Sequence, residues 1–378
     1  MEEITTSQSP DPLNRIGYGS CGSVWSDSSR FPDIDQYTTT TVSSSLPIVL
    51  KRADGLPDRS IENEAKMQKH ILSKNIGSSS FGINIPQHIA FLQPESSIWD
   101  EILPRLPADS RHPCQALISE RILPVRREAR RPLVEKFWNG PADMVDDVVD
   151  DVRNMHCLIR SYLGRRRCLR QGVALRGGRR SMIKLTPISL RNYPLHIDQI
   201  EDLSLPADEY ACAMADGLAF LLWVAEIDAC DVEFVLARPR PRALHPDDDD
   251  VAYPNALPPD NNTFKSDSLG THALWILDFD CCKKLPMTTE GVKMAAESFW
   301  RNDPYYPNPN ARCEKDAALW SVFKNRFLET SAEMMMAHKD EATRALELPG
   351  LLIARIVDTV GVYSKGVVPS ASVISVLE

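Results

Sequence analysis

Four features of this sequence occur in an order that suits the chemistry of nucleotide phosphates. A glycine-rich turn lets backbone N–H groups approach phosphate oxygens, and a lysine after an apolar run can pair with those oxygens. An aspartate after a long helix can orient an acceptor hydroxyl, and one at the end of an apolar strand can hold Mg²⁺. In chain order these residues are Gly17, Gly19, Gly22, Lys51, Asp228 and Asp278.

This order resembles the ATP site of the protein-kinase-like fold. The resemblance implies that the glycines cover the phosphates, that Lys51 pairs with them, and that Asp228 is catalytic. It also implies ATP and Mg²⁺ as cofactors, with Asp278 as a metal ligand. We therefore expect an α+β protein with a kinase-like two-lobed fold, in which ATP lies between a β-rich small lobe and an α-rich large lobe.

The elements around Lys51 are those needed to position it. The run that ends at Lys51 is apolar and β-branched, which predicts a strand, and residues 60–72 have helical spacing. The kinase resemblance implies a helical glutamate that pairs with this lysine; Glu64 is the expected residue and Glu62 the alternative. The apolar strand 116–124 stands where the hinge between the lobes, which receives adenine, would fall.

A helix predicted over residues 206–226 leads directly to Asp228. In kinases a metal-holding Asn follows the catalytic Asp after four residues, and Glu233 stands there in this chain. Glutamate can bind Mg²⁺ through oxygen, but it adds a negative charge near the phosphates. We therefore expect Glu233 and Asp278, which follows the apolar strand 273–277, to be the two metal ligands.

Two departures from protein kinases favour a small-molecule acceptor. The triplet Asp278-Phe279-Asp280 is similar to the motif of aminoglycoside- and choline-phosphotransferase relatives, because Asp replaces the usual Gly. Glu226-Ile227 replaces the usual His-Arg, and no Ala-Pro-Glu follows Asp278. We therefore expect phosphoryl transfer to the hydroxyl of a small molecule, such as a metabolite of a specialised pathway, and not a regulated protein kinase.

Three stretches resemble a fungal family of unknown function whose members are often labelled zinc-finger proteins. They comprise residues 190–196, residues 211–219 with 227–236, and residues 274–280. The resemblance covers mainly residues 110–310 and implies no particular activity. The nine cysteines include no Cys-x-x-Cys pair, and the closest two, Cys281 and Cys282, are adjacent. That spacing suits a closed zinc site poorly, so no zinc is expected.

The predicted organisation has a polar, disordered N-terminus over residues 1–14 and a small lobe over 15–123. The large lobe covers 124–378, and residues 141–163 are expected to be largely helical. Within it, a stretch rich in Pro, Asp and Asn at about 238–270 is expected to be a mobile insertion.

Composition narrows the partners and the compartment. The net charge of −9 argues against general nucleic-acid binding. The sequence has no run of about 18 apolar residues, so no membrane span is predicted. The polar N-terminus and the odd number of cysteines favour an intracellular location, cytoplasmic or nuclear. The basic stretch at 165–180 is assigned no ligand. A small-molecule acceptor or a protein partner is expected.

Two other interpretations stay open. In the first, the chain is a catalytically impaired pseudokinase or scaffold, in which Glu226-Ile227, Glu233 and Asp280 have eroded the chemistry and stable protein partners are expected. Alternatively, the cleft is reused for a biosynthetic reaction without ATP, such as a cyclisation or elimination. At the level of single residues, Asp228 could instead cap a turn.

Overall fold

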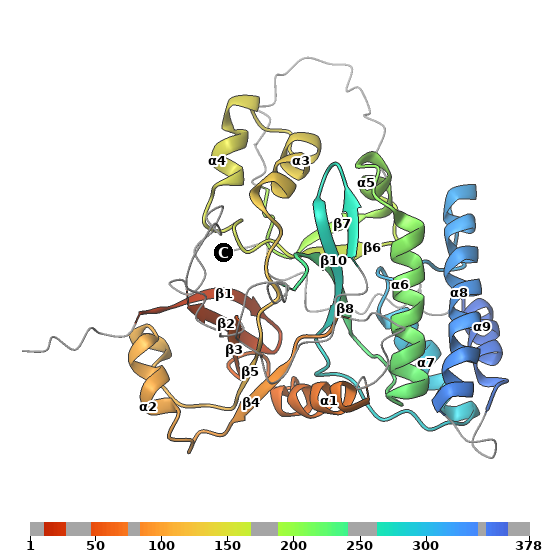
Figure 1. The fold of residues 1–378 in the computed structure, drawn as a ribbon, viewed down its shortest axis with the longest axis horizontal. Helices are drawn as coiled ribbons and strands as arrows, with labels where there is room; N and C mark the ends of the chain where they lie inside the picture. Colours follow the sequence, from red (N-terminus) through yellow and green to blue (C-terminus); the bar gives the residue numbers. More distant parts are fainter. Residues whose placement is uncertain are drawn as a thin grey trace, which may run out of the picture.

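The computed structural model describes residues 11–27, 47–74, 84–167, 188–240, 263–338 and 345–361. Within these residues the chain is a mixed α+β protein with two five-stranded sheets and nine α-helices. Figure 1 shows the two sheets side by side, with α1 (Ile61–Lys74) beneath them and the helices α6 to α9 gathered on the far side of the second sheet.

The first sheet is antiparallel and has the order β1-β2-β3-β5-β4. Trp25 and Leu50 pack beneath it with Trp99 of the short helix α2 (Trp99–Ile102). The strands are β1 (Leu13–Gly19), β2 (Gly22–Asp27), β3 (Ile48–Arg52), β4 (His88–Leu92) and β5 (Ala116–Glu120).

Strand β1 begins earlier than the sequence indicates. Leu13 pairs with Asp27 across the hairpin, so the last two residues of the predicted disordered segment 1–14 belong to the strand. Pairing with β2 satisfies backbone groups that the polar sequence alone leaves open to water. Residues 1–10 lie outside the described residues.

The helix predicted over residues 60–72 is α1. Its buried positions recur with helical spacing, and its acidic first turn and Lys74 in the last turn suit the helix dipole. The buried residues are Ile61, Glu64, Ala65, Met67, Gln68 and Ile71. Glu64 is therefore a carboxylate on the inward face of the helix.

The second sheet has the order β7-β6-β8-β10-β9, and the pair β6 and β7 is parallel while the other pairs are antiparallel. Its strands are β6 (Ile159–Tyr162), β7 (Tyr193–His196), β8 (Glu233–Ala237), β9 (Thr263–Ser266) and β10 (Gly270–Leu277).

The helical structure predicted for residues 141–163 is wrong. Residues 141–163 were expected to be helical, but they hold only the helix α4 (Val145–Val149), a short 3-10 turn before it, and the strand β6. Tertiary pairing with β7 and β8 overrides the local pattern there. The region beyond residue 124 therefore contains a full sheet as well as helices.

The predicted mobile insertion at about 238–270 is too broad. At its start, Arg240 is buried and pairs with Glu120 of β5. At its end, the strand β9 pairs with β10 in a hairpin. Residues 241–262 lie outside the described residues. Both flanks are fixed because each makes long-range contacts that composition does not reveal.

The remaining helices cover the second sheet and its edges. The predicted helix 206–226 is α6 (Ala207–Ala219), which continues as a fully buried π-helical turn, Phe220–Val224. The others are α3 (Arg127–Phe137), α5 (Ile197–Asp202), α7 (Thr289–Arg301), α8 (Glu314–His338) and α9 (Leu348–Asp358). No helix in the described part of the chain has the length and apolar character that crossing a membrane requires.

Candidate functional site

Lys51 bridges two carboxylates from the two halves of the molecule, meaning the half built on the first sheet with α1 and the half built on the second sheet. Its Nζ lies 2.6 Å from Glu64 Oε2 on α1 and 2.9 Å from Asp278 Oδ1 just after β10. The structure thus brings together three residues that are far apart in the sequence. Glu62, the alternative partner, instead accepts a hydrogen bond from Gln115 at 3.5 Å.

The three groups shift one another's ionisation. Burial opposes the charge on Lys51, but Asp278 and Glu64 raise the pKa of its ammonium above the usual value. Burial likewise opposes ionisation of Asp278, yet Lys51 holds the pKa of this carboxyl below its usual value. For Glu64, burial outweighs the effect of Lys51 and raises the pKa to about 7. Lys51 and Asp278 therefore form the firmly charged pair at neutral pH.

The three predicted glycines lie in the β1–β2 hairpin, and each has a different environment. A Cβ at Gly17 would lie 3.0 Å from the Cβ of Val24 on the facing strand. At Gly22, with φ of +137°, a Cβ would lie 2.0 Å from the backbone oxygen of Arg52. A Cβ at Gly19 would meet nothing within 4 Å. Backbone packing therefore explains Gly22, whereas no packing in the described residues requires glycine at position 19.

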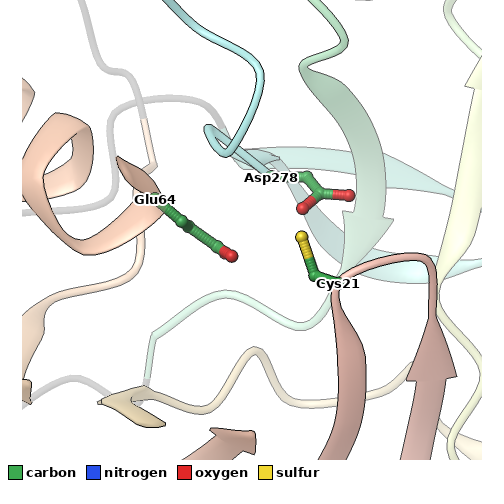
Figure 2. A group of neighbouring side chains, drawn as sticks. All are labelled: Cys21, Glu64 and Asp278. Atoms are coloured by element: carbon green, nitrogen blue, oxygen red, sulfur yellow. The ribbon is translucent and has the colours of Figure 1, made fainter. Parts of the chain in front are cut away.

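The tip of this hairpin points its thiol at the charged pair. Figure 2 shows Cys21, Glu64 and Asp278 converging from three separate elements, and one ligand atom of each lies within 4.8 Å of the others. Burial raises the pKa of the Cys21 thiol well above its usual value. The thiol is therefore neutral in this state, and it occupies the space between the hairpin and Asp278.

Asp228 is bound to the backbone of its own surroundings. Its Oδ1 accepts hydrogen bonds from the N–H groups of Cys230 at 3.2 Å and Lys283 at 2.9 Å, and the residue is only 5% exposed. Burial raises the pKa of its carboxyl. In this arrangement the carboxylate stabilises the junction of two loops, which is the role of a turn cap.

Glu233 lies beside Asp278 because the antiparallel register pairs it with Leu277 at the end of β10. Both of its carboxylate oxygens are bound by Arg160 of β6, at 3.0 and 2.5 Å. Burial raises the pKa of Glu233 to about 6, although Arg160 opposes this shift. The bidentate pair offsets the negative charge that Glu233 brings, and a metal ion would compete with Arg160 for the same oxygens.

Sequence reasoning missed Arg160 because its segment was expected to be helical. The alternating burial of β6, with Ile159 and Ser161 buried and Arg160 and Tyr162 less so, is the period of a strand. That alternation is the signal that could have placed Arg160 on the face it shares with Glu233.

The loops of the site hold an unusual share of left-handed backbone. Six non-glycine residues in the described part of the chain have positive φ, and four of them lie beside the site. Glu226, Ala229 and Asp231 lie in the segment before β8, and Asp278 directly follows β10. Such conformations cost free energy and are found where surrounding structure enforces them, often at functional sites. None of these positions carries glycine, so sequence inspection does not reveal them.

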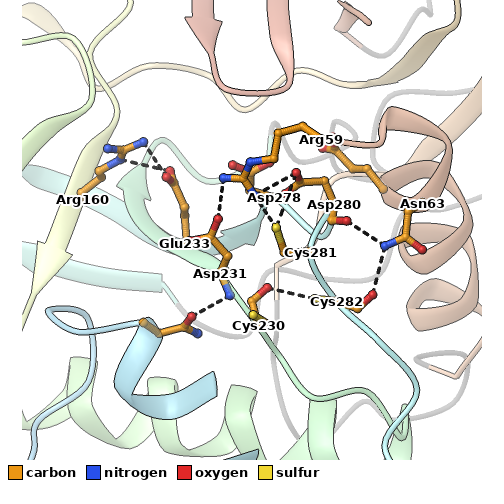
Figure 3. A network of polar contacts seen from close by, with 12 residues as sticks. Arg59, Asn63, Arg160, Cys230, Asp231, Glu233, Asp278, Asp280, Cys281 and Cys282 are labelled. Carbon is orange, nitrogen blue, oxygen red and sulfur yellow. Dashed lines mark hydrogen bonds and ion pairs between the residues drawn. The ribbon is translucent and has the colours of Figure 1, made fainter. Parts of the chain in front are cut away.

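A second acidic grouping lies beside the first. Single ligand atoms of Asp231, Asp280 and Cys281 lie within 4.8 Å of one another, and Arg59 pairs with both carboxylates. Figure 3 shows this network together with the Arg160–Glu233 pair. Each grouping thus contains one thiol and two carboxylates, and each already has a cationic side chain among them.

The first arginines of the predicted basic stretch 165–180 are neutralised within the protein. Arg165 pairs with Asp303, and Arg167 pairs with Asp198. Arg166 binds Glu201 and Asp316. Residues 168–187 lie outside the described residues. Each described arginine of this stretch therefore has a carboxylate partner from a segment later in the chain.

Comparison with known proteins adds one partial match. A model of a family of unknown function, DUF3669, described as "Zinc finger protein", matches residues 274–339. No curated protein and no solved structure matches the chain. The matched stretch begins within β10 and includes Asp278 and the whole of α7 and α8. It therefore covers the end of the strand that leads to Asp278 and the two helices that follow.

The zinc description does not fit an obvious ligand set among the described residues. Structural zinc sites are built mainly from several cysteines and histidines. The two acidic groupings instead contain one thiol each. The adjacent cysteines have separate partners, since Cys282 donates to the Cys230 carbonyl and Cys281 contacts Arg59. None of the cysteines in the described residues forms a disulfide.

Proposed function

We propose that this protein is an ATP-dependent phosphotransferase-like protein with a kinase-like two-lobed arrangement. ATP and Mg²⁺ lie between the first sheet and the second, and the acceptor is the hydroxyl of a small molecule. Lys51 binds the α- and β-phosphates, Glu64 orients Lys51, and Asp278 holds Mg²⁺. When bound, Mg²⁺ neutralises charge on the phosphates, while the chain positions them.

The contacts of Lys51 carry this proposal. The kinase resemblance selected a strand lysine, a helical glutamate and a strand-end aspartate, and Lys51 Nζ lies 2.6 Å from Glu64 and 2.9 Å from Asp278. A meeting of these three types from β3, α1 and the end of β10 is the arrangement that protein kinases use for phosphotransfer.

The charge balance of the site also suits a divalent cation. Carboxylates outnumber cationic side chains among the described residues here, so the site has a net negative charge that Mg²⁺ would offset. The carboxylates belong to Glu64, Asp231, Glu233, Asp278 and Asp280, and the cations are Lys51, Arg59 and Arg160.

The hairpin tip must move for phosphates to enter. Cys21 fills the space between the hairpin and Asp278, so a triphosphate bound to Lys51 displaces this thiol. Gly19 supplies room, because nothing lies within 4 Å of the position of its absent Cβ. The Leu56 N–H donates to the Ser20 carbonyl of the tip at 2.7 Å, so a displacement of Cys21 has to occur beside this contact.

A scaffold without phosphotransfer is the second candidate, and the placement of Asp228 favours it. A catalytic carboxylate must reach the acceptor hydroxyl, but Asp228 is buried and bonded to two backbone N–H groups. If those bonds persist when ligands bind, the cleft binds nucleotide without transferring phosphate. Nucleotide binding is therefore the property that both candidates can share, and turnover separates them.

Calorimetric titration of ATP with and without Mg²⁺ tests the binding site. Lys51→Met keeps the length of the side chain and removes its charge, and Asp278→Asn keeps the shape and removes the metal ligand. Lys293→Ala, on the exposed face of α7, is the matched control. We expect Mg²⁺-dependent binding by the wild type and the control, and at least about a tenfold loss of affinity in both site variants.

The same proteins separate the two candidates when acceptor hydroxyl compounds are screened for ATP-dependent phosphorylation. Turnover that Asp228→Asn abolishes without unfolding the protein supports the phosphotransferase. Binding without turnover favours the scaffold. Absence of ATP binding by the folded wild type contradicts the phosphotransferase and favours a scaffold that binds no nucleotide.

A further inference from the structure

Arg59 lies between β3 and α1, two residues before the helix begins at Ile61. Its guanidinium is forked between two loops of the other half of the molecule (Figure 3). Nη2 donates to Asp231 Oδ2 at 2.6 Å, and Nη1 lies 2.9 Å from Asp280 Oδ2. Nη1 also contacts the Cys281 thiol. One side chain therefore joins the loop before β8, the segment after β10 and the start of α1.

The burial of Asp280 makes this contact specific. The Asp280 side chain is 0% exposed, whereas that of Asp231 is 44% exposed. Arg59 is thus the close cation for a buried carboxylate whose Oδ1 has no hydrogen-bond partner in the described part of the chain. Removing the guanidinium would take from this buried carboxylate its ion-pair partner, which is unfavourable.

A second side chain from the same segment reinforces the connection. Asn63, in the first turn of α1, donates its Nδ2 hydrogens to the carbonyl oxygens of Asp280 at 2.8 Å and Cys282 at 3.0 Å. The next residue along the helix is Glu64, which binds Lys51. The position of the Lys51–Glu64 pair relative to Asp278 is therefore linked to the contacts of Arg59 and Asn63.

We propose that Arg59 is a positioning residue whose forked guanidinium holds the 228–233 loop and the 278–282 segment against the start of α1. Asp231 is two residues from Glu233, and Asp280 is two residues from Asp278. Holding Asp231 and Asp280 in place therefore directs the Glu233 and Asp278 side chains toward the cleft. The inference relies on the function proposed above only for its ligand, Mg²⁺ with ATP. Lysine should replace Arg59 poorly, because its single ammonium stands on a shorter side chain, whereas the two Nη atoms of Arg59 each bind a different carboxylate.

Hydrogen exchange of the ligand-free protein tests the clamp without any assumption about activity. The variants are Arg59→Lys, Asp231→Asn and the two combined. Arg131→Lys is the control, because Arg131 also pairs with two acids, Glu135 and Asp146, but on the exposed face of α3. We expect amide exchange in 228–233 and 278–282 to quicken about tenfold in Arg59→Lys, with little change elsewhere.

The remaining outcomes are also decisive. The double variant should exchange no faster than Arg59→Lys in the 228–233 loop, because both changes break one contact, whereas additive effects would contradict the clamp. If the Arg59→Lys variant exchanged its amides at the wild-type rate, the proposal would be overturned, since a point charge would then suffice.

Mg²⁺–ATP affinity should fall about tenfold in Arg59→Lys and stay unchanged in Arg131→Lys. If the wild type binds no ATP, the proposed function fails while hydrogen exchange still judges Arg59.

Discussion

Glu64 lies 2.6 Å from the Lys51 ammonium, yet burial raises the pKa of its carboxyl to about 7 from an ordinary value of 4.5. Glu233 behaves similarly, with a pKa of about 6 despite the bidentate contact with Arg160. Both acids bind a proton more tightly in the folded protein than in the unfolded chain. For each acid, the folded state therefore loses stability as pH rises from the pKa of the unfolded chain, 4.5, to the higher pKa of the folded protein.

This sign leads to a prediction for Glu64→Gln. Between about pH 4.5 and pH 7 the wild type should lose stability more steeply than the variant, by up to about 1.4 kcal/mol per pH unit. Urea unfolding across this range measures the slope. Ser73→Ala, an uncharged change near the end of α1, should keep the wild-type slope. Parallel slopes for wild type and Glu64→Gln would show that burial does not raise the pKa of Glu64.

At the scale of elements, the β1–β2 hairpin combines a structural glycine with an open one. Gly22 sits where a Cβ would press on the Arg52 carbonyl, and the next residue, Ser23, binds Asp54 through its N–H at 2.6 Å. The hairpin is thereby attached to the segment after β3. Gly19, three residues earlier, faces open space. Of these two glycines, only Gly19 has room beside it for a ligand.

Gly22→Ala and Gly19→Ala should consequently differ. We expect Gly22→Ala to lower the free energy of unfolding by on the order of 2–3 kcal/mol, because the side chain requires both a strained φ and movement of the Arg52 backbone. Gly19→Ala should change it by less than about 0.5 kcal/mol. Chemical denaturation measures both. Equal costs at the two positions would contradict the packing described for the hairpin.

At the scale of the whole molecule, buried polar contacts connect the two sheets. Arg240, after β8, donates to both oxygens of Glu120 at the end of β5, at 2.8 and 3.0 Å. Nearby, the Ile276 N–H donates to the Asn84 carbonyl at 2.8 Å, and the Asn84 side chain binds the Leu274 carbonyl. These contacts join the first sheet and residue 84 to β10 and the residues after β8, so they help to fix the sheet that carries Lys51 relative to the strand that leads to Asp278.

Glu120→Ala should therefore be strongly destabilising. The exposed fractions of the Glu120 and Arg240 side chains are 2% and 5%, so the change leaves a buried cation without its carboxylate, at about 3–5 kcal/mol. Lys293→Ala, which removes an exposed pair on α7, should cost less than about 1 kcal/mol. Comparison of the two denaturation curves provides the check. A small loss for Glu120→Ala would mean that this pair does not join the sheets.

The sequence by itself determined the local elements and the types of residue at their ends. Hydrophobic periodicity placed a strand before Lys51, helices near α1 and α6, and a strand before Asp278, because each pattern depends only on neighbours along the chain. It failed for β6 and for the flanks of the 238–270 segment. There, pairing with distant strands and the Glu120–Arg240 contact outweigh local preference.

Apart from the expected Lys51–Glu64 pair, only the tertiary structure decided which charges meet. Nothing in the spacing of Arg59 or Arg160 indicates that they bind Asp280 and Glu233, or that Cys21 points at Asp278. Such contacts depend on register, on helix placement and on left-handed backbone at non-glycine residues, all of which are set by packing between distant segments. The order of residues, through the kinase resemblance, was therefore enough to select Lys51, Glu64 and Asp278 as candidate site residues. The pKa shifts of these residues and the contacts that hold them in place follow from the fold.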